Sequence, residues 1–324
     1  MKVDIPKLKE QVIATLKQNF NEAEAQRIAD YLLWAEMSGN KTQGLIKMTG
    51  SGALQDIKPE HAIRIERETK LSQLIDAGAN PAPLVSQIAT DTVIQKAQAH
   101  GFGIVGVHNT FSSNGAQAYY AERIASEDLI GIVMARSPAT AAAFGGIDPI
   151  FGTNPIGLAF PTNDQPLVFD MATAAMTWYG LVLAKARGEA IPENMAIDKD
   201  GNPTTDPAAA MDGALRPFDG GYKGSGLALM VEALAGPLVG AAYGQLEGEW
   251  GSLFIAIDPN LLVDTVQFKN NCSDLINKIK AARKQPGTDA IRLPGERAQR
   301  SRAAAMASAT VEIDDVILSQ LGYS

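Results

Sequence analysis

The stretch Gly101-Phe-Gly-Ile-Val-Gly-Val107 has the glycine spacing of the Rossmann fingerprint, G-x-G-x-x-G. In a Rossmann fold a strand precedes these glycines and a helix begins among them. Here a helical pattern from about Ile88 to Ala99 precedes the glycines, and β-rich residues lie among and after them. The stretch therefore predicts the start of a strand, and we interpret the glycine spacing as coincidental.

The segments downstream of this strand continue the alternation of helices and strands. A helix is expected from about Asn114 to Ala125, and it leads into a second apolar run, Leu129 to Ala135. Further strands are expected at Ile156 to Phe160, Leu167 to Met171 and Leu253 to Ile257, and further helices near Ala174 to Arg187, Ser225 to Leu238 and Val263 to Lys284. This pattern predicts an α/β protein.

The first seventy residues lack strand alternation and contain two helical periodicities. The first predicts an amphipathic helix from about Ile5 to Phe20. The second predicts a helix from about Glu22 to Met37, with Asn21 as its cap and Glu24 three residues later. Far downstream, residues 192–219 are rich in Asp, Asn, Pro and Gly and predict a long surface loop, which either carries function or only wraps the surface.

Composition excludes several classes of protein. The chain has 324 residues, of which 46% are hydrophobic, enough to bury a core in one or two domains. A net charge of -8 disfavours binding to nucleic acid or to anionic membranes. Cys272 is the only cysteine, and the first ten residues carry charges where a secretory signal has an apolar run, so a cytoplasmic location is expected. The apolar stretch from Gly226 to Gly244 contains Glu232 and Pro237 and predicts a buried helix.

No metal site is expected. The three histidines, His61, His100 and His108, form no pair at ligand spacing. The stretch from Asp198 to Asn202 starts like a calcium loop but lacks the glycine and the glutamate that the loop needs further on, so it predicts a turn.

Two polar segments are candidates for ligand binding. Gly220-Gly-Tyr-Lys223-Gly-Ser-Gly226 leads directly into an apolar helix, so its backbone N–H groups and the positive end of the helix dipole would face an anion, beside the charge of Lys223. The alternative is a flexible turn with an exposed lysine. Asp170 ends an expected strand, where its carboxylate accepts a hydrogen bond from a ribose or an amide, or caps the next helix.

Seven blocks of sequence, taken in order, resemble the malate/L-lactate dehydrogenase-like family, which includes ureidoglycolate dehydrogenase and diketogulonate reductase. The blocks are Met134-Ala-Arg-Ser137-Pro, Phe151-Gly-Thr-Asn-Pro-Ile156, Val168-Phe-Asp-Met-Ala-Thr173, Thr204-Thr-Asp-Pro207, Gly221-Tyr-Lys-Gly224 with Leu227-Ala-Leu-Met-Val-Glu232, Ile257-Asp-Pro259 and Leu293-Pro-Gly-Glu296. The likeness covers nearly the whole chain.

The resemblance implies a homodimer with a mixed-sheet domain that binds NAD(P) without a Rossmann fingerprint, and a helical domain formed by the chain ends. The expected parts are residues 1–75, helical; 76–245, the mixed-sheet cofactor domain; and 246–324, packed on the N-terminal helices. The cofactor contacts it implies are Ser137, Asp170, Met171, Ala172, Thr173, Ala174, Lys223, Gly224, Pro294, Gly295 and Glu296. Since no fingerprint acid marks the ribose 2′ position, NAD and NADP both remain open.

The chain departs from the family at its catalytic positions. Where the family carries Ser-His-Gly and an arginine three residues further on, this chain has Thr42-Gln43-Gly44 and Lys47. The family's second histidine corresponds to Ser113, within Ser112-Ser113-Asn114-Gly115. An amide does not titrate near neutrality, so the proton source must be another group. The candidates are His108 at a strand end, Lys47, and a water held by Gln43 and Lys47.

The resemblance and its departures leave three functions open. The first is an NAD(P)-dependent oxidoreductase for a small 2-oxo or 2-hydroxy carboxylate, with Lys47 contacting the anion and Gln43 orienting the carbonyl. The second is a cofactor-binding protein without dehydrogenase turnover, suggested by the loss of both histidines. The third is a cyclic imine reductase, because a protonated imine already carries the charge that a ketone acquires from an acid.

Overall fold

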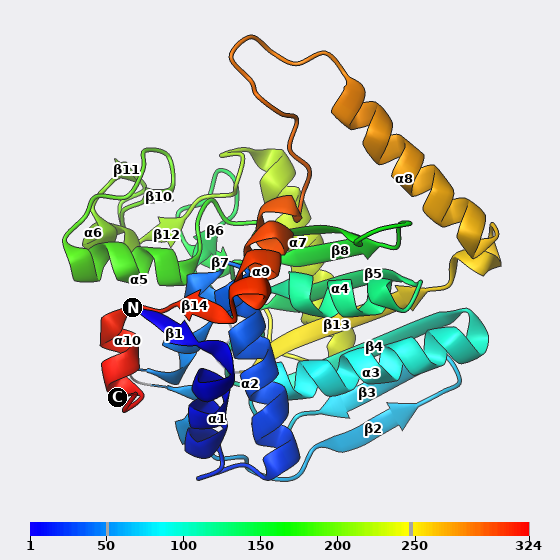
Figure 1. The fold of residues 1–324 in the computed structure, drawn as a ribbon. Coiled ribbons are helices and arrows are strands. Elements are labelled where there is room, and N and C mark those ends of the chain that lie inside the picture. The colour runs from blue at the N-terminus through cyan, green and yellow to red at the C-terminus, as the bar shows by residue number, and fades with distance from the viewer. Residues whose placement is uncertain (50–51, 246–248, 324) are drawn as a thin grey trace.

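A mixed seven-stranded β-sheet forms the centre of the protein (Figure 1). The computed structural model describes residues 1–49, 52–245 and 249–323. The strands lie in the order β2-β3-β4-β13-β5-β8-β9. Their bounds are Arg64–Glu68 (β2), Ser72–Asp76 (β3), Phe102–Thr110 (β4), Trp250–Ile257 (β13), Ile130–Arg136 (β5), Ile156–Phe160 (β8) and Leu167–Met171 (β9). Only β3 and β4 pair in parallel within this sheet, and the other neighbours are antiparallel.

Helices cover both faces of this sheet. Helices α3 (Ala82–His100) and α4 (Gln117–Ser126) pack on the face that carries Val133, and α7 (Tyr222–Ala235) packs on the face that carries the next residue, Met134. Successive side chains of a strand point to opposite faces, so β5 contributes to both cores. The 3₁₀ turn η4 (Pro237–Val239) follows α7 on the second face.

The glycines of the fingerprint-like stretch have three separate structural roles. Gly101 ends α3 with a left-handed φ of 81°. A Cβ on Gly103 would lie 2.6 Å from the carbonyl oxygen of Val93 in α3, and one on Gly106 would lie 2.9 Å from Val239 on the opposite face. Helix α3 precedes these glycines and β4 contains Gly103 and Gly106, so the prediction that a strand starts here is confirmed.

The two chain ends meet beside the sheet. Strand β1 (Lys2–Asp4) pairs antiparallel with β14 (Thr310–Glu312). Helices α1 (Ile5–Leu16) and α2 (Glu22–Met37) follow β1 in the sequence, and helices α9 (Glu296–Ser308) and α10 (Asp315–Gln320) come before and after β14. The predicted capping box is present, since Asn21 accepts from the Glu24 N–H and Glu24 accepts from the Asn21 N–H. The 3₁₀ turns η1 (Lys41–Gln43), η2 (Leu45–Met48) and η3 (Leu54–Asp56) follow α2.

Residues 192–219 are not the long surface loop that their composition predicts. They contain β10 (Ala196–Ile197), β11 (Pro203–Thr204), α6 (Pro207–Asp212) and β12 (Ala214–Leu215). With β6 (Ala141–Ala142) and β7 (Pro149–Phe151) they form a five-stranded sheet, against which α5 (Trp178–Arg187) packs. The strands are too short to show period-2 alternation, and buried Leu181 and Leu215 give this sheet a core of its own. The expected turn at Asp198 is present, because its carboxylate accepts from the N–H groups of Asp200 and Asn202.

The last long helix, α8 (Thr265–Ala281), extends away from the rest of the chain (Figure 1). It follows the short turn η5 (Pro259–Leu261), and none of its residues is buried. Among the described residues, no helix is long and apolar enough to cross a membrane.

The predicted boundaries near residues 75 and 245 do not coincide with the limits of the central sheet. Strand β2 falls before the first boundary, β3 crosses it, and β13 falls after the second. The reason is the position of β13, which inserts between β4 and β5 and pairs with both. The central sheet therefore takes strands from all three expected parts.

Candidate active site

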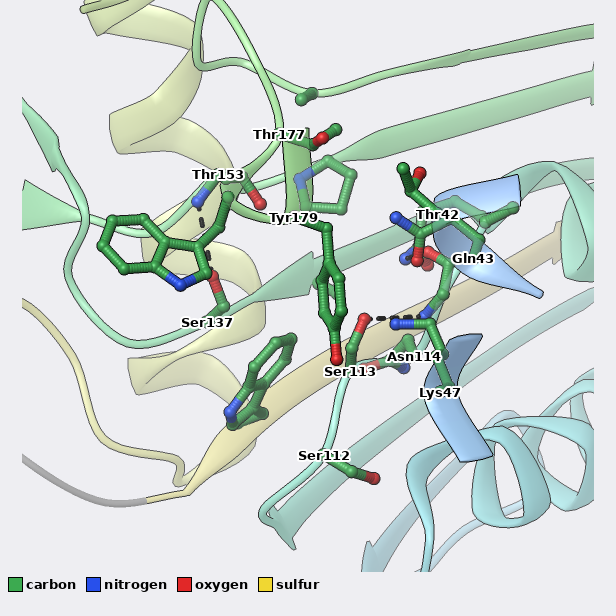
Figure 2. A pocket seen from close by; sticks show the side chains of 18 of the residues that line it. Thr42, Gln43, Lys47, Ser112, Ser113, Asn114, Ser137, Thr153, Thr177 and Tyr179 are labelled. Atoms are coloured by element: carbon green, nitrogen blue, oxygen red, sulfur yellow. Dashed lines mark hydrogen bonds between the residues drawn. The ribbon is translucent and has the colours of Figure 1, made fainter. Parts of the chain in front are cut away.

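A cavity of about 660 Å³ lies where the turns after α2 meet the ends of several strands and the start of α5. Gln43 on η1 and Lys47 on η2 line the cavity. The segment from Phe111 to Gln117, which follows β4, and Tyr179 on α5 also line it. Figure 2 shows Tyr179 between Ser137 and Thr153 on one side and Thr42, Gln43 and Lys47 on the other. The walls of the cavity therefore come from the central sheet, from the N-terminal turns and from α5, the helix that packs on the five-stranded sheet.

A buried carboxylate fixes the turn that carries Gln43 and Lys47. Glu36 is 2% exposed, and it accepts hydrogen bonds from the Leu45 N–H at 2.7 Å and from Lys41 Nζ at 3.0 Å. Burial raises the pKa of Glu36, and the charge of Lys41 counteracts that rise. A Cβ on Gly44 would lie 2.3 Å from Glu36 Oε1, so the glycine allows the carboxylate to reach the turn.

Lys47 is a buried amine that faces the cavity. Its side chain is 4% exposed, and its Nζ lies 4.8 Å from the centre of the Tyr179 ring. Lys47 forms no ion pair with any residue that the structure describes. Burial lowers the pKa of Lys47 to about 7. A lysine with this pKa changes its charge near neutral pH, where an ordinary lysine stays charged.

The loop after β4 is held rigidly in the cavity wall. Gly115 has a φ of 84°, and a Cβ there would lie 1.5 Å from Tyr31 Oη, which accepts from the Ala116 N–H. Asn114 Nδ2 donates to Ser86 Oγ and Ser252 Oγ, while Ser113 Oγ accepts from the Gly115 N–H (Figure 2). Ser113, for which the resemblance predicts the position of the family's second histidine, lines the cavity.

Three amide oxygens of the lining are buried without a hydrogen-bond partner among the described residues. They are Gln43 Oε1, Asn114 Oδ1 and Gln117 Oε1. A buried acceptor left unpaired costs about 1–3 kcal/mol, so these atoms are suited to accept hydrogen bonds from a ligand. Their number and neutrality fit a ligand that presents N–H or O–H donors.

The expected cofactor residues near Ser137 and Asp170 divide between the cavity and the core. Ser137, Asp170, Met171 and Ala172 line the cavity. The Asp170 side chain is solvent-accessible within the cavity, and the cavity walls enclose it. This enclosure raises the pKa of its carboxyl to about 6, and the hydrogen bond that it accepts from the Ala118 N–H at 2.9 Å counteracts the rise. Thr173 and Ala174 do not line the cavity: they are buried, and Thr173 Oγ1 donates to the Asn154 carbonyl.

The glycine-rich run before α7 differs from the expected anion cradle. Asp219 Oδ1 accepts from the N–H groups of Gly221 and Gly224, at 2.9 and 3.1 Å, so these amides are not free. The Asp219 carboxylate therefore lies at the positive, N-terminal end of α7. The spacing of residues in the sequence did not predict this contact. Lys223 is exposed, and neither Lys223 nor Gly224 lines the cavity.

Pro294 and Glu296 line a second cavity of about 660 Å³, together with residues of α8. A Cβ on Gly295 would lie 2.8 Å from the carbonyl oxygen of Val168, so this segment packs on β9 two residues before Asp170. Hydrogen bonding from Lys280, which is the main cause, lowers the pKa of Glu296.

His108 is not brought to the cavity. It lies on β4, and its Nε2 is 2.9 Å from Glu66 Oε2 on the neighbouring part of the sheet. Of the three residues with a predicted catalytic role, only Gln43 and Lys47 line the cavity.

Several residues of the lining were not predicted from the sequence. They include Phe111, Asn114, Gln117, Arg136, Trp178, Tyr179 and Trp250. Arg136 is wholly buried and belongs to the scaffold, since it donates to the Glu249 carbonyl at 3.0 Å and lies 3.4 Å from Glu232. The adjacent aromatic residues Trp178 and Tyr179 follow the Asp170 block by a few positions, and that was the available signal.

Comparisons with known proteins agree with this architecture. A family model described as malate/L-lactate dehydrogenase matches residues 3–322. The malate/(S)-sulfolactate dehydrogenase of Methanothermus fervidus is 35% identical over 93% of this chain and 90% of that protein. The delta(1)-pyrroline-2-carboxylate reductase 1 of Burkholderia ambifaria is 34% identical over 74% of each.

Solved structures show the same fold. The malate dehydrogenase from Entamoeba histolytica has a TM-score of 0.92 at 25% identity, covering 99% of this chain and 96% of that one. The sulfolactate dehydrogenase from Methanocaldococcus jannaschii has a TM-score of 0.88 at 33% identity, covering 99% and 95%. The predicted mixed α/β fold and the predicted class, an NAD(P)-dependent oxidoreductase, are confirmed. The chain belongs to the malate/L-lactate dehydrogenase family.

Proposed function

We propose that this chain transfers a hydride between the nicotinamide of NAD(P) and a small 2-oxo or 2-hydroxy carboxylate in the cavity. The observation that supports this substrate class is the placement of a buried lysine and an unpartnered amide oxygen in one cavity. When charged, Lys47 attracts the carboxylate, and Gln43 Oε1 is free to accept from a 2-hydroxyl group. The relatives named as malate and sulfolactate dehydrogenases act on molecules of this kind.

The lining also fits the cofactor's nicotinamide end. Asn114 Oδ1 and Gln117 Oε1 are buried acceptors without partners, which suits the two N–H donors of a carboxamide. Asp170 is an acceptor for a ribose hydroxyl, and Ser137, Met171 and Ala172 would form the adjoining wall. The bound nicotinamide supplies or accepts the hydride, while the chain binds, orients and polarises the substrate.

The remaining predicted cofactor contacts would hold the outer part of NAD(P). Thr173 and Ala174 would support the Asp170 strand from the core, while Pro294, Gly295 and Glu296 extend the site along β9. Lys223 with Gly224 would lie by the diphosphate. Because Asp219 occupies the helix amides, the lysine charge is the main attraction that this run can offer.

We therefore expect Lys223→Ala to weaken cofactor binding by about 1–3 kcal/mol, the range for hydrogen bonds to charged groups. The free energy of unfolding should change little, since Lys223 is exposed. Fluorescence titration with NADH and NADPH measures the effect. Lys199→Ala, at an exposed lysine in the turn at Asp198, is the matched control and should leave affinity unchanged. Equal affinities in both variants would remove Lys223 from the site.

The proposed substrate class is tested by a screen for oxidation of NADH and NADPH. Small 2-oxo carboxylates form one panel, and cyclic imines that carry a carboxylate form the other. Reduction of a 2-oxo acid is the expected result. If the cofactor binds but neither panel is reduced, the proposal is overturned in favour of a cofactor-binding protein without turnover.

A specific observation favours the cyclic imines as the second candidate. Among the described residues that line the cavity there is no histidine, because Gln43 and Ser113 stand at the family's two histidine positions. A protonated imine needs no acid for its developing charge. The relatives include a delta(1)-pyrroline-2-carboxylate reductase and, among solved structures, a delta1-piperideine-2-carboxylate reductase from Pseudomonas syringae.

We also infer a homodimer that works in the cytoplasm. Leu275 and Ile279 are 56% and 37% exposed on α8, a helix without a buried residue, and apolar side chains at this spacing are suited to a second copy. Sedimentation equilibrium should give about twice the chain mass of 34.3 kDa. A monomer at micromolar concentration would contradict the homodimer. The cytoplasmic location is tested separately, by cell fractionation.

A further inference from the structure

Lys47 has no counter-ion among the residues that the structure describes. The charged or titratable groups on the elements around it include Glu36 on α2, Lys41 on η1, Asp56 on η3, Arg136 on β5, Asp170 on β9 and Tyr179 on α5. Glu36 is already bonded to Lys41 and to the Leu45 N–H, and Asp170 to the Ala118 N–H. Asp56 is exposed. No described carboxylate forms an ion pair with Lys47.

The ring of Tyr179 is the nearest compensation for a charge on Lys47. Its centre lies 4.8 Å from Nζ, within the range of a cation–π contact. Such a contact offsets only part of the free energy that burying an unpaired ammonium costs. Burial therefore dominates, and the pKa of Lys47 falls to about 7. A carboxylate that enters the cavity would supply the counter-ion that no described residue provides.

We propose that binding of the carboxylate substrate is coupled to proton uptake by Lys47, which is an uncharged amine in the empty cavity above neutral pH and an ammonium in the complex. This inference rests on the proposed function, since it takes a carboxylate as the ligand. The proton comes from solvent, so no other reactant is needed. The protein therefore takes up one carboxylate and one proton together.

The coupling predicts how affinity depends on pH. If the site binds the anion only when Lys47 is charged, its affinity falls by up to about tenfold for each pH unit above the pKa that Lys47 has before the anion binds. Below that pKa the lysine is already charged, and affinity levels off. An arginine at this position stays charged at all these pH values, so its affinity would stay level throughout.

The experiment measures binding of oxamate, an unreactive mimic of a 2-oxo acid, to the NADH complex by isothermal titration calorimetry. Wild type, Lys47→Arg and Lys47→Met are compared between about pH 6 and pH 9, in buffers of different ionisation enthalpy. For wild type we expect Kd to rise about tenfold per pH unit above about pH 7.5, with uptake of up to about one proton per oxamate. Lys47→Arg should show a level Kd and no uptake, and Lys47→Met should bind weakly throughout.

Three results would each overturn the coupling. They are a wild-type Kd as level as that of Lys47→Arg, binding without proton uptake at about pH 8.5, and no oxamate binding at about pH 6, where the lysine is charged. The proposed function fails separately. If oxamate binds with proton uptake but no 2-oxo acid is reduced, the coupling stands and the reaction is wrong. If 2-oxo acids are reduced but Kd is level, the reverse holds.

Discussion

Replacing Lys47 with methionine is expected to raise the free energy of unfolding by about 4 kcal/mol at neutral pH. The same change is expected to remove turnover on carboxylate substrates. Each unit of pKa depression corresponds to about 1.4 kcal/mol. Since burial lowers the pKa of Lys47 to about 7, the folded state carries a penalty of this order that methionine, a similar unbranched side chain, does not. The stability gained is matched by loss of the charge that binds the substrate.

The sign of this effect depends on pH in a way that identifies its cause. Between about pH 7 and pH 10 the unfolded lysine holds a proton that folded Lys47 does not, so wild-type stability rises with pH. The advantage of Lys47→Met therefore shrinks across this interval. Urea unfolding at about pH 7 and pH 10 measures the difference.

Lys41→Met is the matched control, since Lys41 lies on the adjacent turn and pairs with buried Glu36. It should lower stability, because it leaves a buried carboxylate without its counter-ion. A Lys47→Met variant less stable than wild type at neutral pH would contradict the explanation.

Restoring a histidine at position 43 is expected to raise turnover on a 2-oxo acid by about 10²–10⁴-fold and to introduce a pH dependence near about 6.5. Gln43 lines the cavity beside Lys47, so an imidazole there would reach a reacting carbonyl that the amide can orient but cannot protonate. Steady-state kinetics of Gln43→His against pH measure this gain.

His108→Gln is the matched comparison and should change turnover little, because His108 pairs with Glu66 outside the cavity lining. Loss of activity in His108→Gln, with no gain in Gln43→His, would mean that the acid acts from β4. If neither change matters, the substrate supplies its own positive charge, and the cyclic imine becomes the better candidate.

The order of helices and strands was predictable because long elements carry their periodicity in the sequence. Strands β8 and β9 begin and end at the predicted residues, and α2 does so with its cap. The strands that were not predicted lack such a local pattern. Two-residue strands such as β10 and β12 are held by neighbours distant in sequence, so no local pattern marks them. Edge strand β2, Arg64–Glu68, is exposed along its length and lacks the alternation of a half-buried strand.

The candidate site was predictable where it consists of sequence blocks and not where it depends on tertiary packing. Gln43, Lys47, Ser137 and Asp170 were found from aligned blocks and do line one cavity. The burial of Lys47 depends on Tyr179, which belongs to the other sheet's helix, and no spacing relates these two residues. In the same way, the hydrogen bonds from Asp219 to the α7 amides exist only once the loop is folded.

The contact between Glu36 and Gly44 also restricts how the protein can evolve. Any side chain at position 44 would begin 2.3 Å from Glu36 Oε1, the carboxylate oxygen that accepts from the Leu45 N–H, while Oε2 accepts from Lys41. A substitution at Gly44 is therefore tolerated only after Glu36 has become a shorter residue, while shortening Glu36 first leaves the Leu45 N–H unbonded. The two positions are epistatic, and each order of mutations passes through a less stable intermediate. Homologues should accordingly keep or exchange both residues together.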